Sequence, residues 1–217
     1  MMNEGNDLNR VLQLEGNIHL TPRRQVKFAQ QTAGTLVLPS GAIVACDPTT
    51  GGLPFTRQVQ PGRYPVVLTL TTERNDIRVA LARLVLADEP PKRWELATWP
   101  EQKRGWFNRR QPTSYSVDSA MGCFMDAQSE NILRHYSGLK RPEFLSSALQ
   151  LDESMGETCN WGEAVLDART GANVMVFSAG RGDGYYSSYW GFSAQNTLVA
   201  LVTDFGMYDF ERHDDKF

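Results

Sequence analysis

Residues 178–205 read SAGRGDGYYSSYWGFSAQNTLVALVTDF, a segment in which glycine-rich turns separate aromatic and aliphatic runs. Residues 173–178, 185–192 and 197–203 have the length and the β-branched and aromatic content of strands. The glycines of residues 180–184 permit the positive φ angles of a tight turn between the first two strands. Because antiparallel strands joined by such turns bury one face, the segment predicts the core of an antiparallel sheet.

Four further strands are predicted nearer the N-terminus. Residues 35–39 and 42–46 are short β-rich runs separated by Pro39-Ser40-Gly41, which we interpret as a hairpin-type turn. Residues 66–72 and 77–87 alternate apolar with polar side chains before the second run becomes continuously apolar. These four segments predict a β-meander.

Helical patterns are few. Residues 7–14 form a short amphipathic pattern. Ser129 is a candidate cap for a helix that Gly138 would close, and Pro142 suits the first turn of a second helix. We therefore predict an α+β fold that is predominantly antiparallel β, meander or sandwich-like, with a two-helix insertion at about residues 128–152.

Composition and charge restrict the class of protein. The chain has 217 residues, of which 41% are hydrophobic, enough for a packed core. No repeat or linker divides it, so we expect residues 1–217 to form a single domain. The formal net charge of −3 argues against a general nucleic-acid binder, whose domain is usually basic. A basic protein partner is compatible with this charge.

The cysteines and the N-terminus suggest a compartment. Cys46, Cys123 and Cys159 form no CxxC pair, which suits buried thiols in a reducing compartment. The N-terminus is polar, and no run approaches the roughly 18 apolar residues of a membrane helix. We expect a cytoplasmic protein that does not enter membranes.

Residues 88–113 differ in composition from the rest, because Trp94, Trp99 and Trp106 alternate with lysines and arginines. Such a pattern is typical of single-stranded nucleic-acid platforms. Four glutamates and aspartates in the same segment dilute its charge, and the whole chain is acidic. We therefore favour a surface loop held by its tryptophans over a nucleic-acid site.

Recognisable catalytic motifs are missing. His19, His135 and His213 stand in no HExxH, HxH or nucleophile-elbow context. The glycines of residues 180–184 resemble a phosphate loop, but no Lys-Ser or Lys-Thr follows them. The sequence therefore predicts no cofactor and no metal ligands of these classes.

Carboxylates are the one arrangement that could support catalysis. Five aspartates fall at predicted strand ends, where a metal ion or an acid/base pair could assemble: Asp47, Asp118, Asp126, Asp183 and Asp204. Aspartate is also a common turn and cap residue that bonds its own backbone. We favour the structural interpretation and keep the carboxylate site as the alternative.

Several short motifs, taken in order, point to a family. They are LVLPSG at 36–41, CDP at 46–48, PGRYPV at 61–66, VD at 117–118, FMD at 124–126, GDGYY at 182–186, YWG at 189–191 and TDF at 203–205. In this order the chain resembles the bacterial family known as domain of unknown function 4241, over about residues 34–205. The resemblance implies a β-rich bacterial protein and brings no established activity.

Two classes of function follow. Some small bacterial proteins of this kind are immunity proteins encoded beside secreted or polymorphic toxins, and this chain is similar to them in size and acidity. We expect a non-enzymatic cytoplasmic protein that binds and neutralises a cognate toxin, such as a basic nuclease effector. The alternative is a metal-dependent hydrolase that uses the aspartates. The candidate partner contacts are Trp94, Trp99, Trp106, Asp209, Glu211, Asp214 and Asp215.

Overall fold

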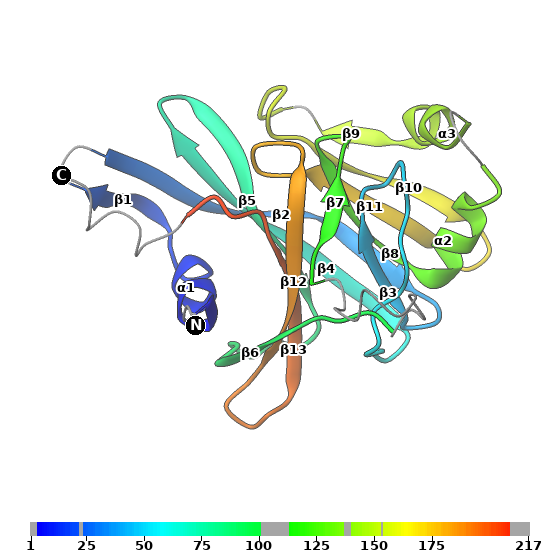
Figure 1. The fold of residues 1–217 in the computed structure, drawn as a ribbon, viewed down its shortest axis with the longest axis horizontal. Helices are drawn as coiled ribbons and strands as arrows, with labels where there is room; N and C mark the ends of the chain where they lie inside the picture. The colour runs from blue at the N-terminus through cyan, green and yellow to red at the C-terminus, as the bar shows by residue number, and fades with distance from the viewer. Residues whose placement is uncertain (1–3, 22–23, 101–112, 137–139, 153, 209–217) are drawn as a thin grey trace, which may run out of the picture.

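Two antiparallel sheets and three helices make up the computed structural model, which describes residues 4–21, 24–100, 113–136, 140–152 and 154–208 (Figure 1). The larger sheet has eight strands, in the order β1-β2-β4-β5-β13-β12-β6, and β7 also pairs with β12. Its strands are β1 (Gly16–Thr21), β2 (Arg24–Leu38), β4 (Gly62–Glu73), β5 (Asp76–Val85), β6 (Arg93–Leu96), β7 (Tyr115–Val117), β12 (Gly184–Phe192) and β13 (Leu198–Asp204).

The smaller sheet has five strands in the order β3-β8-β11-β10-β9. These are β3 (Ile43–Cys46), β8 (Met121–Asp126), β9 (Gln150–Asp152), β10 (Trp161–Asp167) and β11 (Ala172–Ser178). The helices are α1 (Glu4–Val11), α2 (Ala127–Leu133) and α3 (Lys140–Ala148). Figure 1 shows α2 and α3 beside the smaller sheet and α1 beside the larger one. Among the described residues, no helix has the length and apolar character needed to cross a membrane.

The main core lies between the two sheets. Leu36 and Leu68 of the larger sheet contribute to it, as do Phe124 and Phe177 of the smaller sheet. The two phenylalanine rings pack edge to face, with 5.0 Å between their centroids. Side chains alternate across a strand, so every second residue of β3 and β8 points the other way. Those residues, with Leu133 of α2, form a second core against the helices. One face of the smaller sheet therefore packs against the larger sheet, and its other face packs against the helices.

A third, smaller core covers the outer face of the larger sheet. Leu8 and Val11 of α1 pack there on Val26 and Phe28 of β2, and all four side chains are buried. The amphipathic pattern predicted at residues 7–14 is therefore a helix, which begins and ends about three residues earlier. The prediction of an α+β fold dominated by antiparallel strands is confirmed.

The predicted hairpin at residues 39–41 is wrong. β2 pairs with β1 and β4, whereas β3 pairs with β8, so residues 39–42 carry the chain from one sheet to the other. Gly41 has a φ of +75°, and a Cβ there would collide with the carbonyl of Val59. Glycine is therefore required at residue 41 because the chain passes close to Val59, and not because residues 39–41 form a hairpin. Since β3 belongs to the other sheet, the four predicted strands do not form one meander.

The three strands predicted in residues 173–203 exist, but they do not form one sheet. β11 pairs with β8 and β10, whereas β12 pairs with β13, β6 and β7. The turn after β11, in which the N–H of Gly182 donates to the carbonyl of Ala179, therefore also crosses between sheets. All seven residues of β11 are buried, so its apolar pattern does not specify a pairing partner.

The prediction of Ser129 as the helix cap is wrong. Asp126 has the extended backbone of an N-cap, and its side chain accepts from the N–H of Gln128. Ser129 lies inside α2, where its hydroxyl donates to the carbonyl of Asn173 over 3.1 Å. The prediction for Pro142 is confirmed, because it lies in the first turn of α3.

Candidate functional site

Asp47 directly follows β3, and its carboxylate links the loop after β3 to the loop after β7. One carboxylate oxygen accepts hydrogen bonds from the N–H and the hydroxyl of Thr49, at 2.7 and 2.6 Å. The other accepts from the N–H groups of Asp118 and Ser119, each at 2.9 Å. Burial by itself raises the pKa of Asp47, but the bonds from Thr49 and from the Asp118 backbone more than offset it, so the pKa lies below its ordinary value.

This pKa gives Asp47 a predictable effect on acid stability. A carboxylate with a lowered folded-state pKa stabilises the protein above its unfolded value of about 3.9, and this contribution disappears as the pH falls through the folded value. We expect the unfolding free energy of the unaltered chain to decrease from about pH 5 towards about pH 3, and to decrease less in Asp47→Asn. Urea unfolding across this range measures the slope, and an equal slope in both proteins would contradict the prediction.

Asp126 is fully buried and serves as a junction between the sheet crossover and α2. Its carboxylate accepts from the hydroxyl of Ser40 at 2.7 Å, from the N–H of Ser40 at 3.0 Å and from the N–H of Gly41 at 3.2 Å. The N–H of Gln128 adds a fourth bond at 2.8 Å. Both oxygens are therefore occupied in holding the crossover and the helix start.

A buried ion pair fixes the two helices against the loop that follows β3. Arg141 of α3 contacts Glu130 of α2 at 2.7 Å, and both side chains are about 5% exposed or less. The Nε of Arg141 also donates to the carbonyl of Pro48 at 2.7 Å. Arg134 reaches the same glutamate at 3.2 Å, but half of its side chain is exposed.

The remaining candidate aspartates bond to different segments. Asp183 is exposed and accepts from the N–H of Ala120 at 3.1 Å, and Asp204 accepts from the N–H of Gly206 at 2.8 Å. Asp118 is exposed and meets Asp47 through its backbone. Within the described ranges, no group of three or more His, Cys, Asp or Glu could hold a metal ion.

The structure places two of the candidate tryptophans. Trp99 is 7% exposed, packs in the main core and donates its indole N–H to the carbonyl of Leu53 at 3.1 Å. Trp94 is half-buried against the α1 core and donates to the side chain of Asn9 at 2.9 Å. The other candidates lie outside the described residues, and these are Trp106, Asp209, Glu211, Asp214 and Asp215.

The cysteines are buried free thiols, as expected from their spacing. Cys46 of β3 lies opposite Cys123 of β8, with 3.6 Å between the sulfur atoms. The contact with Cys123, together with burial, raises the pKa of Cys46, and burial raises the pKa of Cys159 to about 11. Since the thiolate is the reactive form, Cys46 and Cys159 are poor nucleophiles.

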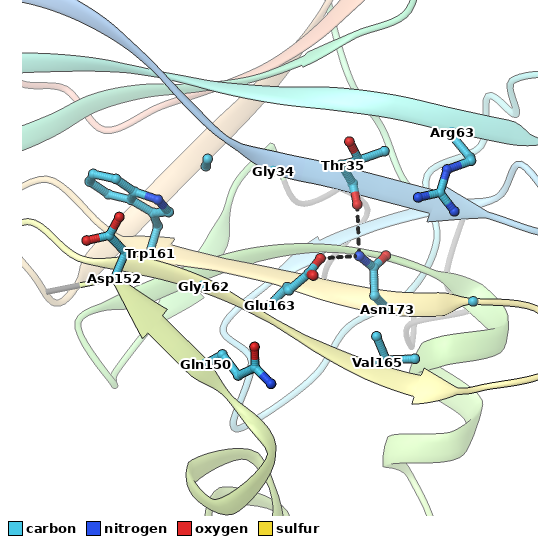
Figure 2. Close-up of a pocket in the computed structure, with 12 residues that line it drawn as sticks. Gly34, Thr35, Arg63, Gln150, Asp152, Trp161, Gly162, Glu163, Val165 and Asn173 are labelled. Carbon is cyan, nitrogen blue, oxygen red and sulfur yellow. Dashed lines mark hydrogen bonds between the residues drawn. The ribbon is translucent and has the colours of Figure 1, made fainter.

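A cleft of about 470 Å³ opens between the two sheets (Figure 2). We call it the inter-sheet cleft, and it is lined mainly by residues 33–35 of β2, Arg63 of β4, Asp152 of β9, Trp161 and Glu163 of β10, and Asn173 of β11. Figure 2 shows Asp152 and Trp161 towards one end, Arg63 at the other, and Glu163 between them. None of these residues was proposed from the sequence.

Asn173 organises the centre of the inter-sheet cleft. Its side-chain N–H₂ donates to the carbonyl of Thr35 at 2.8 Å and to the carboxylate of Glu163 at 3.0 Å. Its side-chain oxygen accepts from the N–H of Val37 at 2.9 Å. Asn173 is only 2% exposed, and these three hydrogen bonds link β11 to β2 and to Glu163 of β10.

A signal for this cleft exists in residues 161–165, which read WGEAV. Trp161, Glu163 and Val165 alternate with two small residues, which places a carboxylate on the face that should be apolar. A Cβ at Gly162 would collide with the carbonyl of Gln150, so glycine allows β9 to pair here. A polar residue on the inward face of a strand is a detectable departure from a closed core.

Comparison with known proteins gives a family and no described activity. No curated protein and no solved structure matches the chain. The chain matches one family model over residues 36–203, close to the extent expected from its motifs. The description of that family is "Protein of unknown function (DUF4241)". Since the match covers well over half of the chain, this protein belongs to the DUF4241 family.

Proposed function

We propose that this chain is a non-enzymatic, cytoplasmic immunity-type protein that binds a cognate bacterial toxin one-to-one and neutralises it. One observation carries the proposal. Three of the four large apolar side chains that are exposed among the described residues come from β9, the loop after it and β10, and they are Leu151, Met155 and Val165. Leu151 lies opposite Gly162 and shares the face of Ala164, whereas Val165 lies on the cleft face, so these side chains flank the outer edge of the smaller sheet on both faces. Exposed apolar side chains beside an open sheet edge are typical of protein-binding surfaces.

The position of these side chains in the sheet supports a docking role. β9 is the last strand of the smaller sheet, and all three of its residues are exposed. An edge strand offers unpaired N–H and C=O groups to another chain. Apolar side chains beside such an edge would add contact area to a partner that meets the strand.

Charge supports a basic partner. The chain has a net charge of −3, and Asp152 and Glu163 lie beside the apolar side chains on the same two strands. Acidic groups around an apolar contact accelerate association with a basic surface. A nuclease domain with a basic substrate cleft is such a partner.

The roles of the buried aspartates also support a binder. Asp47 and Asp126 each use both oxygens to accept hydrogen bonds that hold loops. A carboxylate occupied in this way has little capacity left for a metal ion or a proton-transfer step. The alternative of a carboxylate-based hydrolase gains no specific observation, so we keep the binder.

Calorimetric titration against the protein encoded by the neighbouring gene tests the proposal. We expect one-to-one binding that weakens at least about tenfold in the double variant Leu151→Ser/Val165→Ser, equivalent to about 1.4 kcal/mol. Tyr185→Ser is the matched control, because Tyr185 is 80% exposed but belongs to β12 of the larger sheet. Its affinity should change less than about twofold.

Two results would contradict the proposal. The absence of binding heat with the protein encoded by the neighbouring gene would show that this protein is not the partner. Inhibition of that protein by clearly substoichiometric amounts would indicate turnover and hence an enzyme.

A further inference from the structure

We propose that Cys46 and Cys123 form a redox-sensitive pair, which a peroxide converts into a disulfide that fixes the start of the loop after β3 to β8. We call residues 47–52, the first part of that loop, the Asp47 loop. The inference is independent of the proposed toxin binding, because it concerns the chemistry of the unbound chain alone.

The two sulfur atoms face each other across the smaller sheet. Cys46 of β3 is paired with Cys123 of β8, so both side chains point to the same face, and their sulfur atoms lie 3.6 Å apart. The N–H of Ala127 donates to the carbonyl of Ala42 at 2.8 Å, which makes these two residues a hydrogen-bonded pair in the same register. Because such pairs alternate along a ladder, Cys46 and Cys123 are also a hydrogen-bonded pair, with about 5.5 Å between their Cα atoms.

This separation allows a disulfide to form without movement of the two strands. The Cα atoms of disulfide-bonded cysteines are usually roughly 4.4–6.8 Å apart. Rotation of the two side chains has to bring the sulfur atoms from 3.6 Å to about 2.05 Å. Cys159, the third buried thiol, lies outside the ladder of β3 and β8, so the geometry selects one pair from the three cysteines.

The reaction with hydrogen peroxide has two steps. In the first, a thiolate of the pair attacks one peroxide oxygen, the O–O bond breaks, and a sulfenic acid forms; the hydroxide that leaves takes up the thiol proton and becomes water. In the second, the other sulfur loses its proton and attacks the sulfenic sulfur, which forms the S–S bond and releases a second water. The two cysteines are oxidised, and the peroxide is reduced to two water molecules.

Burial makes the first step slow, whereas proximity makes the second step fast. Both side chains are 2% exposed or less, and the contact with Cys123, together with burial, raises the pKa of Cys46. Little thiolate is therefore present, and the pair stays reduced unless peroxide persists. Once a sulfenic acid has formed, the other sulfur lies beside it, so the disulfide forms before a second peroxide can oxidise the sulfenic acid further.

The Asp47 loop is the segment that the disulfide restricts. The loop folds back over the cysteine that precedes it, since a Cβ on Gly52 would lie 2.9 Å from the Cβ of Cys46. Within the loop, the N–H of Gly51 donates to the carbonyl of Asp47 at 2.9 Å. A covalent bond from Cys46 to β8 prevents the end of β3 from separating from the sheet, so the loop opens less often.

Mass spectrometry of the full chain after treatment with hydrogen peroxide tests the formation of the bond. After proteolysis we expect the peptide that contains Cys46 to be linked to the peptide that contains Cys123, with the loss of two hydrogen atoms. Cys123→Ala should abolish the link. Cys159→Ala is the matched control, because it also replaces a buried cysteine, and it should leave the link intact.

Thermal unfolding and amide hydrogen exchange test the effect of the bond. A disulfide between cysteines 77 positions apart should raise the Tm by at least about 5 °C. Exchange of the Gly51 amide should slow by at least about threefold. Dithiothreitol should reverse both effects, because it reduces a disulfide and leaves methionine sulfoxide unchanged. Cys123→Ala treated in the same way should show neither effect.

Three results would overturn the proposal. The first is that both cysteines remain free thiols, or become sulfinic or sulfonic acids, after prolonged treatment. The second is a link that involves Cys159, which would show that the ladder of β3 and β8 does not select the pair. The third is unchanged exchange of Gly51 in the linked protein, which would show that the bond does not restrict the Asp47 loop. None of these results bears on toxin binding, so the two proposals fail separately.

Discussion

Asp126→Ala is expected to lower the free energy of unfolding by about 3–5 kcal/mol, because four hydrogen bonds lose their acceptor. Three of the donors are backbone N–H groups at the sheet crossover and at the start of α2. A donor left without a partner inside the protein costs about 1–3 kcal/mol, and loss of an N-cap alone costs about 1 kcal/mol. Urea denaturation followed by circular dichroism measures the loss.

Asp183→Ala is the matched control for this prediction. Asp183 is also an aspartate near a strand end, but it is exposed, and its carboxylate accepts from the N–H of Ala120 at 3.1 Å. We expect its replacement to cost less than about 1 kcal/mol, because water can replace the carboxylate. If both variants lost similar stability, burial of Asp126 would not be the cause of its effect.

Arg141→Met should cost a similar amount, about 3–5 kcal/mol, because it leaves the carboxylate of Glu130 buried without its principal cation. The substitution also removes the bond to the carbonyl of Pro48, which links α3 to the loop after β3. The methionine retains most of the volume, so the loss reports the charge and its hydrogen bonds more than packing. Thermal and urea unfolding together give the change.

The chain offers two controls for Arg141. Arg134→Met removes a second arginine from the same glutamate, but this arginine is half exposed, so we expect a loss below about 1 kcal/mol. The double variant Glu130→Leu/Arg141→Met removes both buried charges and should recover much of the stability lost in the single variant. A double variant no more stable than Arg141→Met would show that the unpaired charge is not the main cost.

The sequence predicted where most of the central strands lie, because their local patterns are strong. Residues 35–39, 66–72 and 77–87 largely coincide with parts of β2, β4 and β5. It did not predict which strands pair, since a turn between sheets uses the same glycines and prolines as a hairpin. Gly41 illustrates this, because glycine is needed there to avoid a collision between a side chain and the carbonyl of Val59.

The candidate site divides in the same way. The positions of Asp47 and Asp126 at strand ends were predictable, since each follows or ends a short apolar run. The inter-sheet cleft was not, because Arg63, Asp152 and Glu163 come from separate strands of two sheets. Only the pairing of β9 with β10 and the approach of β2 to β11 bring them together. The alternation of residues 161–165 indicates that Glu163 departs from an apolar strand face, but it does not show which distant segments lie beside that residue.

The order of strands in the larger sheet has a consequence for synthesis on the ribosome. Val85 of β5 lies opposite Ala200 of β13, so the edge of β5 has no strand to pair with until residues 198–204 have been made. During that interval the nascent chain carries an open apolar sheet, a state prone to aggregation. Because β5 and β13 are far apart in the sequence, their pairing also predicts slow folding of the complete chain, in the range of milliseconds to seconds. We therefore expect a chaperone that covers the edge of β5 until β13 has been made to increase the yield of folded protein.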